Sequence, residues 1–202
     1  MKVIEQLLAN AGISPIAGVD EAGRGACAGP LVIASVVLND PFAAELGVVR
    51  DSKEIAENKR DAVFDLIHQV AASVSVVIVP AHEVDSRGVH AANLDGMRRA
   101  VQGLSVEPAY VLTDGYAIEG LGVPNLAVWK GDQVVVSISA ASVIAKVTRD
   151  RIMREMDNEF PQYGFAGHKG YITAAHTQAL QEHGPCGQHR RSFANVAALI
   201  HK

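Results

Sequence analysis

The chain is poor in cysteine and in aromatic residues. Its 202 residues include two cysteines, Cys27 and Cys186, and aromatic side chains make up 5% of the sequence. Two cysteines exclude a disulfide framework, and the sequence has no Cys-x-x-Cys pair for metal binding or thiol exchange. Such scarcity is typical of proteins that work in a reducing compartment.

Long apolar runs are also missing. Val74–Pro80 and Ala140–Ala145 are the longest candidates, and neither approaches the roughly 20 residues needed to span a bilayer. Residues 1–12 lack the basic start and the apolar run of a signal peptide. We therefore expect a cytoplasmic protein without a membrane partner.

The sequence has no general excess of basic side chains. With 18 basic and 22 acidic residues, its formal net charge is −4, which excludes a uniformly basic coat for nucleic acid. The charge is uneven, because residues 129–202 carry 9 basic and 6 acidic groups, whereas residues 61–128 carry 3 and 8. A polyanionic partner is therefore expected to meet the C-terminal third.

What the chain does have is enough apolar residues, 49%, for the core of one domain, with or without a small appendage. Strands and helices alternate along it, which predicts an α/β fold. The first two strands are close enough to be antiparallel, so the sheet should be mixed. Strands are expected at Ile16–Asp20, Leu31–Leu38, Val74–Pro80, Ala109–Thr113 and Asn125–Trp129, and helices at Lys59–Val70, Val89–Gln102, Ser139–Phe160, Thr173–His183 and Ala194–His201.

Four acidic residues stand where acids are unexpected. Asp20 and Glu21 follow an apolar strand, and Asp114 closes another. Strand ends of α/β sheets are where ligand sites usually form. Asp150 continues an apolar stripe of the long helix and should therefore point toward the protein.

Converging carboxylates repel one another, and hard divalent cations such as Mg²⁺ or Mn²⁺ relieve that repulsion. Two such ions can activate a water and stabilise the leaving oxygen of a phosphodiester. Each acid also has a structural reading: a turn residue at Asp20, Glu21 or Asp114, or an ion pair of Asp150 with Lys146 or Arg154. Adjacent strand residues point to opposite faces, so Asp20 and Glu21 share a site only if the strand ends or twists there.

Other motifs are weaker. The glycine-rich segment Gly23–Ala28 loosely matches a dinucleotide fingerprint, but a strand follows where that motif needs a helix. It is better read as a loop that approaches a ligand closely, with Arg24 available to a phosphate, or as a plain turn. His183, Cys186 and His189 lack a fourth ligand for zinc. Tyr163, Phe165 and Tyr171 could stack on nucleotides or pack a loop onto the sheet.

Taken together, these motifs resemble the ribonuclease HII family. The resemblance runs in order through nearly the whole chain. It covers Gly18–Gly25 with Ala28–Pro30, Asp51–Lys53, Thr113–Gly115, Lys130–Asp132, Ser139–Arg151, Tyr163–Phe165, His168–Tyr171 and His189–Phe193. Arg50 and the acidic stretch 157–159 depart from the pattern, away from the expected site.

The resemblance implies an RNase H-like fold, a mixed sheet flanked by helices with a small helical C-terminal extension. It implies a catalytic domain at 1–160 and the extension at 161–202. The expected activity is endonucleolytic cleavage of the RNA strand of RNA/DNA hybrids. Nicking of duplex DNA 5′ to a single embedded ribonucleotide is also expected. Both would leave 3′-OH and 5′-phosphate ends.

The resemblance also assigns roles to residues. The four carboxylates that would bind Mn²⁺ or Mg²⁺ are Asp20, Glu21, Asp114 and Asp150. Gly23, Arg24 and Gly25 would sense the ribonucleotide 2′-OH, and Tyr171, rather than Tyr163, would meet the RNA–DNA junction. Candidate phosphate contacts are Arg24, Lys53, Lys146 and Arg149. We expect a monomer without an organic cofactor.

Two other functions fit parts of the pattern. A two-metal nuclease of the junction-resolvase kind would cut a substrate that contains no ribonucleotide. A non-catalytic hybrid-binding module would bind without cleavage and would not need all four acids.

Overall fold

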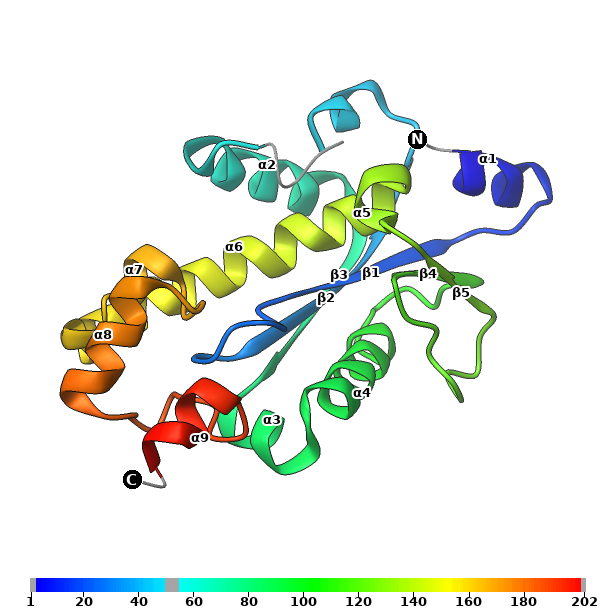
Figure 1. Ribbon diagram of the computed structural model, residues 1–202. Coiled ribbons are helices and arrows are strands. Elements are labelled where there is room, and N and C mark those ends of the chain that lie inside the picture. Colours follow the sequence, from blue (N-terminus) through cyan, green and yellow to red (C-terminus); the bar gives the residue numbers. More distant parts are fainter. Residues whose placement is uncertain (1–2, 50–54, 201–202) are drawn as a thin grey trace.

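The structure, a computed structural model, describes residues 3–49 and 55–200. Its centre is a five-stranded sheet in the order β3-β2-β1-β4-β5 (Figure 1). β2 pairs antiparallel with β1 and β3, whereas β4 lies parallel to β1 and to β5. The expected mixed sheet is confirmed. The strands are β1 (Ile16–Ala22), β2 (Leu31–Leu38), β3 (Ala71–Val79), β4 (Tyr110–Asp114) and β5 (Asn125–Val128).

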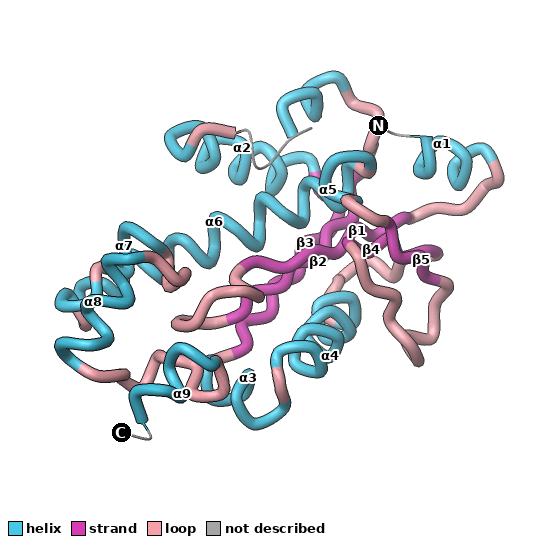
Figure 2. The backbone as a smooth tube through the Cα atoms, viewed as in Figure 1, coloured by secondary structure: helices cyan, strands magenta, loops and turns pink. Residues whose placement is uncertain are grey.

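Helices cover both faces of the sheet, as Figure 2 shows. Every residue of β2 is buried, and its side chains alternate between two cores. Val32, Ala34 and Val36 pack toward α2 (Glu57–Val70) and α6 (Val136–Glu159). Leu31 and Ile33 pack on the opposite side, where α3 (Ala81–Arg87) and α4 (Val89–Gln102) lie.

The long helix α6 crosses β1 closely at its N-terminal end. A Cβ on Gly18 would overlap the backbone of Ser137, so only glycine permits this approach. The helix has no local side-chain cap. Instead the buried carboxylate of Glu5, on α1 (Val3–Asn10), accepts hydrogen bonds from the backbone N–H groups of Val136 (2.9 Å) and Ser137 (3.0 Å). A carboxylate at a helix N-terminus satisfies open donors and complements the helix dipole.

The C-terminal part packs on the second half of α6 and on the loop between β1 and β2. Thr173 caps α8 by accepting a hydrogen bond from the N–H of His176. A β-bridge joins Ala28 in the loop to His189. The segment comprises η2 (Pro161–Tyr163), α7 (Phe165–His168), α8 (Ala174–His183) and α9 (Ala194–Ile200).

Several bounds differ from expectation. β1 continues past Asp20 to Ala22, because Glu21 and Ala22 still pair with β2. α6 begins at Val136 rather than Ser139, since Glu5 caps it from a distance. The sequence analysis did not predict α1, α3, η1 (Ala44–Val49), the one-turn α5 (Gly131–Val134), η2 or α7. Within residues 3–49 and 55–200, no helix has both the length and the apolarity to cross a membrane.

Candidate active site

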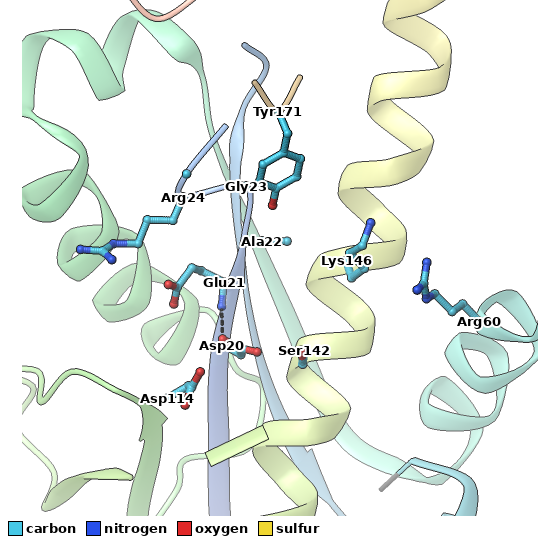
Figure 3. A pocket seen from close by; sticks show the side chains of 11 residues that line it. Asp20, Glu21, Ala22, Gly23, Arg24, Arg60, Asp114, Ser142, Lys146 and Tyr171 are labelled. Carbon is cyan, nitrogen blue, oxygen red and sulfur yellow. Dashed lines mark hydrogen bonds between the residues drawn. The ribbon is translucent and has the colours of Figure 1, made fainter. Parts of the chain in front are cut away.

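A pocket of about 400 Å³ opens where β1 and β4 end. The two strands are parallel, so their carboxyl ends meet at the same edge of the sheet. Figure 3 shows the pocket between the end of β1 and the flank of α6. The residues that line it are Asp20, Glu21, Ala22, Gly23, Arg24, Gly25, Arg60, Asp114, Ser142, Lys146 and Tyr171.

Asp20 and Glu21 reach this pocket from opposite faces of β1. The strand does not end between them, and their side chains diverge in Figure 3, with Asp20 directed toward Ser142 on α6. Both nevertheless line the pocket, which therefore extends across the strand. Asp20 also accepts a 2.7 Å hydrogen bond from the backbone N–H of Glu21. The two acids line one pocket although β1 does not end between them; a strand end was one of the two conditions, end or twist, that the sequence analysis named.

Burial raises the pKa of Asp20 well above its usual range, and the charges of Glu21 and Asp114 raise it further. The pKa of Glu21 is raised to about 7, by burial first; the cation of Arg24 opposes this rise and Asp114 adds to it. These shifts show that the three carboxylates act on one another in a partly dry site.

Asp114 stands at the last position of β4. One of its carboxylate oxygens accepts a 2.7 Å hydrogen bond from the backbone N–H of Gly131, at the start of α5. The preceding residue, Lys130, has a left-handed backbone (φ +52°), which makes the turn from β5 into α5. The Lys130–Asp132 motif therefore has a structural role, because the backbone turn that it makes orients the carboxylate of Asp114.

Asp150 is buried on α6, as its stripe predicted. It pairs with Lys146 one helical turn earlier, and Arg60 on α2 lies 4.0 Å away. The ion pair with Lys146 was one of the two structural readings of Asp150. These cations hold Asp150 at the margin of the pocket, and it is not among the lining residues.

The donor set suits a hard divalent cation, since its four acids offer only oxygen ligands. Glu21 Oε2 and Asp150 Oδ1 are buried and have no hydrogen-bond partner within the described chain, so each retains a lone pair for another ligand. Across residues 3–49 and 55–200, no three acidic, histidine or cysteine side chains converge tightly enough to enclose an ion by themselves. The pairing of Asp150 with two cations is consistent with this open arrangement.

The glycine loop, defined as Gly23–Pro30, is held by two buried arginines. Arg149 on α6 donates hydrogen bonds to the carbonyls of Pro30 (2.9 Å) and Ala28 (3.1 Å). Arg190 donates to the carbonyls of Gly29 (3.0 and 3.1 Å) and Arg24 (3.1 Å). Because Arg149 is 1% exposed and its guanidinium is engaged in this way, we no longer assign it a phosphate contact. Its role is to shape the loop.

The remaining predicted residues lie in different surroundings. Tyr171 is 40% exposed and lines the pocket, with the guanidinium of Arg149 5.4 Å from its ring centre. Tyr163 is buried and donates a 2.7 Å hydrogen bond to the carbonyl of Gly184. Arg24 lies over the ring of Tyr116, 4.7 Å from its centre. The predicted phosphate contact Lys53 lies outside the described residues.

Sequence reasoning missed Ser142, Arg60 and Arg190. Ser142 donates a hydrogen bond that lowers the pKa of Asp20 against the larger effect of burial. One signal was available, because Ser142 lies two turns and Lys146 one turn before Asp150 on α6, on a common face. No local signal marks Arg60 or Arg190, whose partners are far away in the sequence.

Comparison with known proteins places these features in a family. The family model described as "Ribonuclease HII" matches residues 17–196. The Ribonuclease HII of Mycolicibacterium smegmatis is 55% identical over 196 residues, which cover 97% of this chain and 72% of that protein.

Solved structures agree with this result. The ribonuclease H2 of Pyrococcus horikoshii OT3 superposes with a TM-score of 0.79 at 25% identity, covering 92% of this chain and 97% of that one. Bst-RNase HIII in complex with Mn²⁺ shares the fold, with a TM-score of 0.68 at 17% identity over 96% of this chain and 72% of that one. The chain therefore belongs to the ribonuclease HII family, whose members are metal-dependent endoribonucleases that act on RNA/DNA hybrids.

Proposed function

We propose that this chain also nicks duplex DNA 5′ to a single embedded ribonucleotide, and that it hydrolyses its substrates with two divalent ions to leave 3′-OH and 5′-phosphate ends. One observation carries the proposal. Asp20, Glu21 and Asp114 line one pocket, which is also lined by Tyr171 and by the first three residues of the glycine loop. Groups suited to hydrolysis and groups suited to reading a sugar therefore face the same space.

The carboxylates are the residues that would hold the ions. Asp20, Glu21 and Asp114 are the proposed direct ligands, and Asp150 would complete the binding site of the second ion. Mn²⁺ or Mg²⁺ bound there would supply activation of the attacking water and stabilisation of the leaving 3′ oxygen. Lys146 and Arg60, which neutralise Asp150, keep a buried charge from standing alone.

The rim residues would recognise the strand. Arg24 and Lys146 line the pocket and are the proposed phosphate contacts, which add affinity without sequence preference. The carbonyls of Arg24, Ala28 and Gly29 are engaged by Arg149 and Arg190, which fixes the backbone of the loop. A fixed backbone can both donate to and accept from a 2′-OH, the group that distinguishes RNA from DNA. Tyr171 would stack on the next sugar and exclude a second 2′-OH there.

We further propose that residues 161–202 form an extension on a catalytic domain of residues 1–160, and that the protein acts as a monomer. Contacts of α7 and η2 with α6, and of His189 with the loop, support the first point.

The test uses three matched substrates: an all-DNA duplex, the same duplex with one ribonucleotide, and an RNA/DNA hybrid. Each is incubated with the protein in Mg²⁺, in Mn²⁺ or in chelator. The expected result is metal-dependent cleavage of the hybrid and a single nick 5′ to the ribonucleotide, with the all-DNA duplex intact.

Other outcomes discriminate between the alternatives. Cleavage of the hybrid alone would overturn the proposed roles of the glycine loop and Tyr171. Cutting of all-DNA substrates would favour a resolvase-like nuclease. Binding of the hybrid without cleavage in any metal would leave a binding module.

A further inference from the structure

Two histidines outside the proposed chemistry are buried beside the glycine loop. His176 on α8 and His189 lie with their Nε2 atoms 3.0 Å apart. His189 Nδ1 is 3.0 Å from the backbone nitrogen of Cys186, and His176 Nδ1 is 3.0 Å from the carbonyl oxygen of Tyr171. A continuous line of hydrogen bonds therefore runs from Cys186 through the histidine pair, His176 and His189, to Tyr171.

The two ends of this line fix where its protons are. A backbone N–H only donates, so His189 Nδ1 is the acceptor and the neutral ring of His189 carries its proton on Nε2. A carbonyl only accepts, so His176 carries its proton on Nδ1 and leaves Nε2 bare. His189 Nε2–H then donates to His176 Nε2. Each of the three bonds holds one proton, and both rings are neutral.

An additional proton would break this line. On His176 it would set two N–H groups against each other, and on His189 it would face the N–H of Cys186. Several titratable or charged groups face the pair. The ring of His168, on α7, stacks on that of His176 with the ring centres 4.2 Å apart. The others are Tyr163 on η2, Cys27, Cys186, on which Glu159 acts, and the neighbouring Arg190. Burial lowers the pKa of both histidines, and that of His189 falls to about 4.

The line ends on a backbone that connects Tyr171 to the glycine loop. The N–H of Tyr171 donates to the carbonyl of His168 (3.0 Å), while its own carbonyl accepts from His176. The carbonyl of the preceding residue, Gly170, accepts from the N–H groups of Cys27 (3.0 Å) and Ala28 (3.3 Å). His176 thus holds the segment that places Tyr171 relative to the loop.

We propose that the neutral histidine pair is a positioning element for Tyr171, so that it sets the preference for a ribonucleotide followed by a deoxyribonucleotide. This inference rests on the proposed role of Tyr171. The pair does not touch substrate; it acts by fixing the backbone that carries the tyrosine ring.

The first test is spectroscopic and uses the unaltered protein. Nitrogen-15 NMR of the imidazoles at neutral pH should show His189 protonated on Nε2 and His176 protonated on Nδ1, with coupling across the N–H···N bond. The opposite tautomer on either ring, or a charged imidazolium, would overturn the proposal.

The second test is kinetic and follows the ratio of kcat/KM for a duplex with one ribonucleotide to kcat/KM for a long RNA/DNA hybrid. His176→Phe should lower this ratio by about tenfold, the loss typical of one buried hydrogen bond. His176→Asn, whose amide can donate from near the Nδ1 position, should keep the ratio within about twofold of the original. His183→Gln, at the exposed end of the same helix, is the matched control and should leave the ratio unchanged.

A double variant separates positioning from general damage. In a Tyr171→Ala background, His176→Phe should cause no further change in the ratio, because the pair acts through Tyr171. Equal losses on both substrates, or a further loss in that background, would overturn the positioning role. If Tyr171→Ala alone leaves the ratio unchanged, the proposed function of Tyr171 fails. If Tyr171→Ala lowers the ratio but a folded His176→Phe variant leaves it unchanged, only the proposed role of the histidine pair fails.

Discussion

At Asp20, burial and the neighbouring carboxylates both raise the pKa of the side chain. The side chain is 5% exposed, and both Glu21 and Asp114 raise its pKa. A carboxylate in this position costs the metal-free fold some stability at neutral pH, because the unfolded chain ionises it more easily.

Asp20→Asn should therefore abolish cleavage and make the metal-free protein more stable. We expect activity to fall by more than about a hundredfold, since a proposed ligand is lost. Urea unfolding in chelator should show a higher midpoint than that of the unaltered protein. Unchanged turnover would exclude Asp20 as a ligand, and a lower midpoint would show that its charge is compensated in the fold.

Gly23 and Gly25 offer a matched pair of substitutions at the glycine loop. Gly23 has φ +87°, and a Cβ there would overlap the side chain of Arg149, whereas a Cβ on Gly25 meets no atom within 4 Å. Gly23→Ala should lower the free energy of unfolding by about 2 kcal/mol or more, and Gly25→Ala by less than about 1 kcal/mol. Equal effects in denaturant titrations would contradict this account of the loop.

The carboxylates could be predicted residue by residue because each leaves a local mark. Asp114 ends an apolar strand, and Asp150 interrupts an apolar stripe. Asp20 and Glu21 were predicted to share a site if β1 ends or twists there, and the structure shows that β1 continues through both residues. Arg149 was predicted to contact phosphate, because nothing in its own sequence neighbourhood shows that its guanidinium donates to loop carbonyls.

At the scale of elements, the loop between β1 and β2 depends on two distant segments. Arg149 holds it from α6, and Arg190 holds it from the stretch between α8 and α9. Burial, and then the charge of Arg149, lower the pKa of Arg190 to about 10, so it stays charged at neutral pH. Two guanidinium groups are tolerated there because carbonyl oxygens accept hydrogen bonds from their N–H groups.

Arg190→Lys should lower stability far more than the same charge-conserving substitution at an exposed arginine. An ammonium cannot reproduce the three bonds of the guanidinium fork, so we expect a loss of about 2–4 kcal/mol in unfolding free energy and a parallel loss of cleavage. Arg191→Lys, at the exposed next position, should change stability by less than about 0.5 kcal/mol. Similar melting curves for the two variants would show that Arg190 does not hold the loop.

Helix bounds show where prediction from sequence stops. The helices α2, α4, α6, α8 and α9 were found because they carry their own periodicity, and α8 carries its own cap at Thr173. The start of α6 was placed three residues late because its cap, Glu5, stands on another helix. Short elements such as α3 and α5 have too few residues to show a period.

At the scale of the whole molecule, stability should respond to acid through the buried histidines. His189 has a pKa of about 4 in the fold, against about 6.5 in an unfolded chain. Since the unfolded state binds the proton first, the fold loses stability as pH falls from about 6.5 to 4, by at most about 3 kcal/mol.

His189→Gln keeps a donor near the Nε2 position and removes the titration. Its unfolding free energy, measured in urea across this range of pH, should therefore fall less steeply than that of the unaltered protein. Parallel curves would assign the acid sensitivity to other groups.

The position of Arg190 in the chain also bears on synthesis. The strands and acids of the site are complete by residue 150, yet the loop at its rim is closed by residues 188–190. A ribosome adds residues from the N-terminus onward, so the sheet can form while the loop still lacks its second guanidinium. A nascent chain that has the carboxylates but has not yet exposed Arg190 would hold an unfinished substrate rim, and ribonucleotide recognition would arise only after residue 190 has left the ribosome.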